Sequence, residues 1–122
     1  MIFSRGREHL GRRLADFLVT ALENPETRRR MTGLVRAAAS EPEAASIVRE
    51  LIAREVFARI IDALEVDDAE LRASLLGSQV VRLVMARHIV ALEPLASLPA
   101  ERTAAAIAPN HQRYLTGPLD EA

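Results

Sequence analysis

Cysteine and lysine are both absent from this chain of 122 residues. Without cysteine the fold holds no disulfide, and thiol catalysis and cysteine-ligated metal sites are excluded. Because lysine is missing, all 16 basic side chains are arginines, and with 17 acidic ones they leave a formal net charge of −1. This balance gives no overall attraction to nucleic acid or to an anionic membrane. The opening residues, MIFSRGREHLGRR, contain no apolar run long enough for a signal peptide, so we expect a cytoplasmic protein.

Strand signals are also missing. Glycine and proline are few, at 5 and 6 residues, and no alternation of apolar and polar side chains persists. Apolar residues recur instead at helical spacing, which predicts an all-α fold, a five- to six-helix bundle. We expect one domain over residues 1–117 and a disordered tail at 118–122.

Residues 75–92, LLGSQVVRLVMARHIVAL, form the most informative segment because they are apolar on almost every side of a helix. A surface helix has a single apolar stripe, whereas a helix that is apolar all round is buried all round. The two arginines in the segment argue against a membrane span, where arginine is rare and costly. The segment therefore predicts a helix that faces both its own core and a second subunit.

Capping and stop signals divide the chain into helices. They are expected at about 4–23, at 25–39, from Ser40 to about 64, from 67 to just before Pro94, and after Ser97. The predicted start signals are Asn24 before Pro25, Ser40 in a capping box with Glu43, the Asp67-Asp68-Ala69-Glu70 run, and Ser97 before Pro99. Pro109 removes a backbone donor, so it should kink or break the fifth helix and leave a last piece at 110–115.

Residues that could carry chemistry are scattered. His9, His88 and His111 lie on three predicted helices without metal-ligand spacing, so we expect no metal. Ser74, Ser78 and His88 share one helix, but even Ser78 and His88 lie ten residues apart, roughly 15 Å along its axis, so they cannot form a nucleophile and base pair within one subunit. A glycine-rich phosphate loop is absent, and we expect no cofactor and no enzymatic activity.

Arg82, Arg87 and His88 are the polar exceptions in the apolar segment. A buried arginine needs a partner or access to water. Arg82 is expected either to pair with Glu93, Asp62 or the second subunit, or to serve as a polar anchor in a ligand pocket or at a dimer axis. For Arg87 a carboxylate partner is favoured, and His88 is interpreted as a satisfied core histidine. The run of arginines at 28–30 fans around its helix and is interpreted as a solvated face.

Large, adaptable apolar side chains stand on several predicted helices. Most such residues are core, but ligand sites in bundles are built from them when a cavity lies between the helices. The residues considered for such a cavity are Phe17, Leu34, Phe57 and Met85, together with Met31.

Much of the chain resembles the C-terminal regulatory domain of TetR-family transcriptional regulators. The matching pieces are LLGSQVV, MAR, the linker EPLASLP, IAP and RYLTG, and the stretch RRLADFLVTALENPETRRRMTGLVRAA looks like the first helices of that domain. Two departures stand out: Arg82 occupies a position where relatives often have glycine, and His88 one where they often have tyrosine.

The resemblance implies a homodimer formed through the last two long helices, and a pocket for a small apolar or amphipathic effector. DNA would be bound only through an N-terminal helix-turn-helix, for which the residues before Arg5 leave no room. No membrane association is implied. The expected interface residues are Ser78, Arg82, Met85 and Ile89 on one helix stripe and Ala104, Ala105 and Ala108 on the fifth helix. The expected pocket residues are Phe17, Leu34, Phe57 and Met85.

Two other functions remain open from the sequence. A stand-alone helical interaction module could pair with a full-length homologue and would need no cavity. A small helical enzyme would need polar groups that converge on a pocket, and the sequence does not show such a set.

Overall fold

The computed structural model describes residues 7–120, except for the side chains of residues 53–56. Helices account for the regular secondary structure of these residues. The α-helices are α1 (Leu10–Glu23), α2 (Pro25–Ala38), α3 (Pro42–Val48), α4 (Ala58–Leu64), α5 (Ala69–Leu83) and α6 (Ala100–Thr116). Two 3-10 turns, η1 (Arg7–His9) and η4 (Leu95–Ser97), and two wider π-helical stretches, η2 (Arg49–Phe57) and η3 (Val84–Ile89), connect or extend them. No strand occurs between residues 7 and 120, so the all-α prediction is confirmed.

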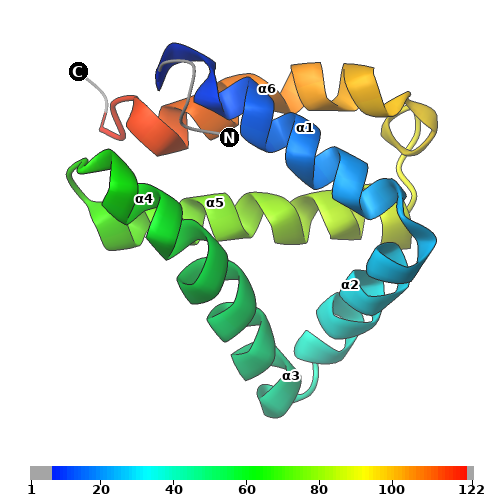
Figure 1. The fold of residues 1–122 in the computed structure, drawn as a ribbon. Helices are drawn as coiled ribbons and strands as arrows, with labels where there is room; N and C mark the ends of the chain where they lie inside the picture. Colours follow the sequence, from blue (N-terminus) through cyan, green and yellow to red (C-terminus); the bar gives the residue numbers. More distant parts are fainter. Residues whose placement is uncertain (1–6, 121–122) are drawn as a thin grey trace.

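Three helical paths form a triangle (Figure 1). One side is α2, the second is the continuous path of α3, η2 and α4, and the third is α5. In the same view, α1 and α6 run side by side above α5, and these two pack more extensively than any other pair. The core lies between these layers and is centred on Leu14, Phe57, Leu76 and Leu115, which are almost fully buried. Deep burial of such large side chains is the main driving force for this arrangement.

Gly11 allows α1 and α6 to approach closely. A Cβ atom at this position would lie 2.5 Å from the backbone nitrogen of Gln112 and 2.7 Å from the carbonyl oxygen of Ala108. The Gly11 amide uses the short separation by donating to Oε1 of Gln112 at 2.6 Å. The start of α1 is therefore held against α6 by a hydrogen bond to the Gln112 side chain.

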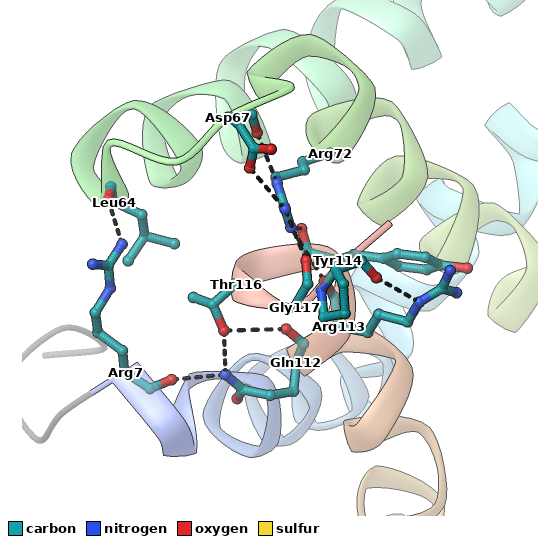
Figure 2. A network of polar contacts seen from close by, with 10 residues as sticks. Arg7, Leu64, Asp67, Arg72, Gln112, Arg113, Tyr114, Thr116 and Gly117 are labelled. Atoms are coloured by element: carbon teal, nitrogen blue, oxygen red, sulfur yellow. Dashed lines mark hydrogen bonds and ion pairs between the residues drawn. The ribbon is translucent and has the colours of Figure 1, made fainter. Parts of the chain in front are cut away.

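Arg72 ties the end of α6 to the start of α5 (Figure 2). It is 3% exposed, and its guanidinium donates to the carbonyl oxygen and carboxylate of Asp67 at 2.8 and 3.1 Å. It also donates to the carbonyl oxygens of Arg113, Tyr114 and Gly117 at 3.2, 3.1 and 2.7 Å. Arg113 and Tyr114 lie in the last turn of α6 and Gly117 is its C-cap, where intrahelical donors run out. The arginine thus satisfies the end of one helix from inside another.

A second set of contacts lies beside Arg72 (Figure 2). Arg7 donates to the carbonyl oxygen of Leu64, and the Gln112 amide donates to the carbonyl oxygen of Arg7 at 2.8 Å. Gln112 also donates to the hydroxyl of Thr116 at 2.8 Å. The entry to α1, the end of α4 and the last turns of α6 are thereby held together.

The predicted helix ends are mostly right, but several predicted caps are wrong. Asn24 is confirmed as a cap, since its side chain accepts from the amides of Glu26 and Thr27 at 3.0 and 3.2 Å. Ser40 does not cap, because α3 starts one residue later, with Glu41 in the cap position and no side-chain bond there. At the start of α5, Asp68 is in the left-handed region with φ 51°, and no side chain caps the helix.

The C-terminal helix differs from the prediction in two ways. Ser97 does not cap α6, because both its amide and its hydroxyl bind the carboxylate of Glu93, at 3.0 and 2.6 Å. Pro109 does not break the helix, since α6 is continuous through it, and the predicted piece at 110–115 belongs to the same helix. The side chain of Arg113, within α6, donates to the carbonyl oxygens of Pro118 and Leu119, which follow the helix, at 3.0 and 2.9 Å.

Some predictions concern residues that lie outside the description. These are positions 4–6 of the first predicted helix and positions 121–122 of the predicted tail.

Candidate functional site

An apolar pocket with a volume of about 150 Å³ lies between α1, α2, η2 and α5. Helices α1 and α2 and stretch η2 supply most of its wall, and α5 supplies one side chain. The lining residues are Leu18, Ala21 and Leu22 from α1, Thr27 and Met31 from α2, Leu51, Ile52 and Phe57 from η2, and Val80 from α5. Leu51 is 46% exposed, so the pocket reaches the surface at η2.

Local sequence signals explain why these side chains converge. Leu18 and Leu22 are four residues apart and therefore share one face of α1. The Asn24 cap fixes where α2 begins, which sets Thr27 in its first turn. Met31 follows four residues later on the same face. Thus the α1–α2 corner determines two walls of the pocket.

The lining is neutral and almost wholly apolar. Thr27 is the one residue with a polar side chain among the lining residues, and its hydroxyl oxygen does not contribute to the pocket surface. A charged molecule would find no counter-ion in this lining, and burial of an unpaired charge is strongly unfavourable. The pocket is therefore suited to binding an uncharged apolar molecule, and its lining offers no acid, base or strong nucleophile.

The pocket residues expected from the sequence are only partly found there. Phe57 lines the pocket, as does Met31, which had been considered with it. Phe17 is 60% exposed on the outer side of α1 and lies outside the lining. Leu34 and Met85 are partly buried but are not lining residues either.

Most of the lining was missed because helical spacing identifies a buried face but not where that face leaves space. Leu18, Leu22 and Val80 read as ordinary core positions. The sequence signal for Thr27 is its position on the capped helix, four residues before Met31 and therefore on the same face.

The expected interface residues lie on α5, η3 and α6, and all but Ala104 are at least partly exposed. Ser78, Met85 and Ile89 are partly buried, and Arg82 is exposed. On α6, Ala105 is exposed and Ala108 is partly buried. Ala104 is 1% exposed within its own chain, so it has no surface left for a partner and is removed from the set.

The two arginines of the apolar segment have different environments. Arg87 is buried, lies 3.3 Å from a carboxylate oxygen of Glu23, and donates to the carbonyl oxygens of Leu95 and Leu98 at 3.3 and 2.6 Å. Its predicted carboxylate partner is confirmed. Arg82 is exposed instead of buried, and within residues 7–120 it forms no hydrogen bond or ion pair with Asp62, Glu93 or any other side chain.

The histidines do not converge. His9 is exposed on η1, whereas His111 is buried on α6, and burial lowers the pKa of His111 to about 4. Burial, followed by the neighbouring charges of Arg87 and Arg28, also lowers the pKa of His88. Nε2 of His88 and Nδ1 of His111 are buried without a hydrogen-bond partner, so His88 is not the satisfied histidine expected. Over the described chain, no group of three or more His, Asp or Glu residues could hold a metal ion.

The other polar residues considered are satisfied locally. The hydroxyls of Ser74 and Ser78 donate to carbonyl oxygens of their own helix, those of Leu71 and Leu75, at 2.9 and 2.6 Å. In the arginine run, Arg30 pairs with Glu26 at 2.8 Å on the surface. Both arrangements are contacts within a single helix.

Comparisons with known proteins define the family. Among residues 7–120, no helix has both the length and the apolar character needed to cross a membrane. Neither the curated proteins nor the solved structures gave a match. A family model described as the tetracyclin repressor-like C-terminal domain matches residues 8–115, nearly the whole chain. The chain therefore belongs to the TetR-type C-terminal domain family.

Proposed function

We propose that this chain is the effector-binding and dimerisation domain of a TetR-type transcriptional regulator. The apolar pocket between α1, α2, η2 and α5 is the observation that carries the proposal. A void lined by flexible apolar side chains and reachable from the surface is the usual form of a small-molecule site between helices. In this proposal the chain performs no chemical step, and DNA is contacted by a helix-turn-helix outside residues 8–115.

Helix α5 links the pocket to the proposed dimer surface. Val80 lines the pocket, while Ser78 and Arg82, each two residues away, point to the other side of the helix. A ligand that favours one position of α5 would therefore favour one arrangement of the two subunits. Such regulation requires the ligand to bind the two arrangements with different affinities.

The surface of α5, η3 and α6 supports the proposed homodimer. Arg82 and the small Ala105 are exposed there, and the apolar Met85 and Ile89 are only partly covered by the chain itself. A shallow groove beside them is lined by Gln79, Leu83 and Ala86 of α5 and η3, together with Arg82, Leu95 and Ile107. Small and apolar groups permit close packing of helices from two subunits.

The pocket can be tested by filling it. Ala21 is a lining residue, so an Ala21→Leu variant places three additional carbon atoms in the void. A thermal-shift screen of small uncharged compounds should give compounds that raise the unfolding temperature of the wild-type chain. The same compounds should lose most of this effect on Ala21→Leu, because the space they occupy is taken.

Ala39→Leu is the matched control, since Ala39 is exposed at the end of α2 and is not a lining residue. It should respond to the compounds as the wild type does. Compounds that stabilise all three proteins equally bind elsewhere, and that result would contradict the proposal.

A further inference from the structure

We infer that Arg82 from each of two subunits binds a shared oxyanion, such as phosphate, at the axis of the proposed homodimer. The inference rests on the homodimer of the proposed function and adds a ligand class and the residue that recognises it. It follows from the spacing of the surface that carries Arg82, from the lack of a partner for this side chain among the described residues, and from the scarcity of carboxylates around it.

The outer side of α5 and η3 carries a stripe of residues spaced alternately four and three positions apart. Its members are Leu71, Leu75, Ser78, Arg82, Met85 and Ile89. This spacing is typical of helices that pack against a partner helix. Leu71 is 50% exposed, and the other apolar members are only partly covered by the chain itself. A second copy that covers this stripe also covers Arg82, its single charged member.

Arg82 lacks a polar partner within the described part of its own subunit. Its side chain is exposed and makes no hydrogen bond or ion pair with another residue between 7 and 120. It borders a groove together with Gln79, Leu83, Ala86, Leu95 and Ile107. The surface of this groove is almost wholly apolar, so the stem of Arg82 lines it and the guanidinium lies outside it. The charged end is therefore left at the surface of the subunit.

Carboxylates are scarce on the helices of the proposed interface. Glu70 is the only acidic residue of α5 and η3, and Glu101 is the only one of α6. Both lie in the first turn of their helices, whereas Arg82 lies in the last turn of α5. In the linker between α5 and α6, the Glu93 carboxylate already accepts from the amide and hydroxyl of Ser97. The counter-ion of Arg82 must therefore come from outside the subunit.

The symmetry of a homodimer makes this requirement sharper. A two-fold axis brings together equivalent residues that lie at the centre of the contact. Ser78 and Arg82 are the two central members of the stripe, so a dimer centred on it places the two Arg82 side chains near each other. Two guanidiniums that lose water without a counter-ion are strongly unfavourable.

An oxyanion between the two subunits removes this cost. A guanidinium is planar and donates two parallel hydrogen bonds to the oxygens of a phosphate or a carboxylate. A phosphate ion has four oxygens and can accept from two such groups at once. The site is incomplete in one subunit, because each contributes a single arginine. Anion binding and dimerisation are therefore coupled.

Dimer formation with and without phosphate tests the site. The dimer dissociation constant of the full chain can be measured by sedimentation equilibrium in chloride buffer and with about 10 mM inorganic phosphate, at one pH and one ionic strength. The variant Arg82→Gln removes the charge and keeps a polar side chain. Arg36→Gln is the matched control, because Arg36 is exposed on α2 and lies outside the proposed interface.

We expect phosphate to tighten the wild-type dimer about tenfold, since an anion that binds only the dimer shifts the equilibrium by mass action. Arg82→Gln should lose this response. In chloride it should dimerise at least as tightly as the wild type, because it buries no charge. Arg36→Gln should respond to phosphate as the wild type does. Any general strengthening of apolar burial by phosphate would appear in all three proteins alike.

The other outcomes overturn the inference in distinguishable ways. A wild-type dimer that phosphate does not tighten would remove the anion site, and an equal response of Arg82→Gln would remove Arg82 from it; in both cases the proposed function would stand. A weaker Arg82→Gln dimer in chloride would show that Arg82 pairs with a carboxylate of the partner subunit instead. A wild-type chain that stays monomeric in both buffers would overturn the inference and the proposed homodimer together.

Discussion

Acid should destabilise this fold through one buried histidine. His111 is 1% exposed on α6, its Nδ1 atom has no hydrogen-bond partner, and burial lowers its pKa from 6.5 to about 4. The unfolded chain takes up a proton near pH 6.5, whereas the folded chain takes it up only near pH 4. The stability that comes from keeping this ring neutral is therefore present above pH 6.5 and is lost as the pH falls toward 4.

The size of the effect follows from the two pKa values. Between pH 7 and pH 5, the difference in proton uptake between the unfolded and folded states lowers the free energy of unfolding by about 2 kcal/mol. This is a large fraction of the stability of a domain of this size, which is typically about 5–15 kcal/mol. Most carboxylates titrate below pH 5, so this interval reports mainly on histidine.

Urea unfolding at pH 7 and pH 5, at one protein concentration, measures the effect. The variant His111→Leu removes the titrating ring, so its stability should fall by about 2 kcal/mol less than that of the wild type over the same interval. His9→Leu is the control because His9 is exposed, and it should keep the wild-type pH dependence. The reasoning is refuted if wild type and His111→Leu lose the same free energy between the two pH values.

Three further changes probe the fold and the proposed dimer. Arg72→Met removes the guanidinium donor of the Tyr114 and Gly117 carbonyl oxygens at the end of α6, and urea unfolding should show a loss of about 3 kcal/mol; a loss under 1 kcal/mol would show that this network contributes little. Gly11→Ala collides with the backbone of α6 and should destabilise by about 1–3 kcal/mol, whereas Gly33→Ala meets no atom within 4 Å and should stabilise by up to about 1 kcal/mol; equal effects would contradict the close helix contact. Met85→Asp should give a monomer in light scattering, because it buries a charge at the proposed interface, while Phe17→Asp, at an exposed position of α1, should keep the wild-type dimer mass; a folded Met85→Asp dimer would move the interface elsewhere.

Periodicity was sufficient to predict the helices, because each one buries a face against the same core. The path from Pro42 to Leu64 and the end of α1 before Asn24 follow directly from the positions of apolar side chains and prolines. The cap at Asn24 was predictable because only local contacts are involved. The Ser97 cap was wrong, because its hydroxyl donates to the carboxylate of Glu93, four residues earlier, and Pro99 occupies the cap position of α6.

Pro109 and Arg72 show the limits of local rules in a packed helix. A proline in a helix interior removes a hydrogen bond, yet α6 continues through Pro109, held along its length by packing against α1. Arg72 stands among polar residues at the start of α5, and nothing in the sequence singled it out as buried. Asp67, one of its partners, lies five residues away, but the others are backbone carbonyls 41 to 45 residues away, and no sequence spacing identifies them.

The pocket was predictable in kind but not in position. The sequence indicated adaptable apolar residues on several helices, and Phe57 was correctly placed among the lining residues. Whether a given face is filled or left open depends on how side chains from four elements meet. Phe17 and Val80 are apolar residues on predicted helices, but one faces solvent and the other the pocket.

The most direct test of the pocket is a crystal structure of the chain under xenon pressure, since xenon enters dry apolar cavities of this size. The pocket described here predicts a xenon site in contact with Leu22, Ile52 and Val80, and no such site in Ala21→Leu crystals. A void closed by side chains, with no xenon between α1, α2, η2 and α5, would contradict the central claim that this domain carries an effector pocket.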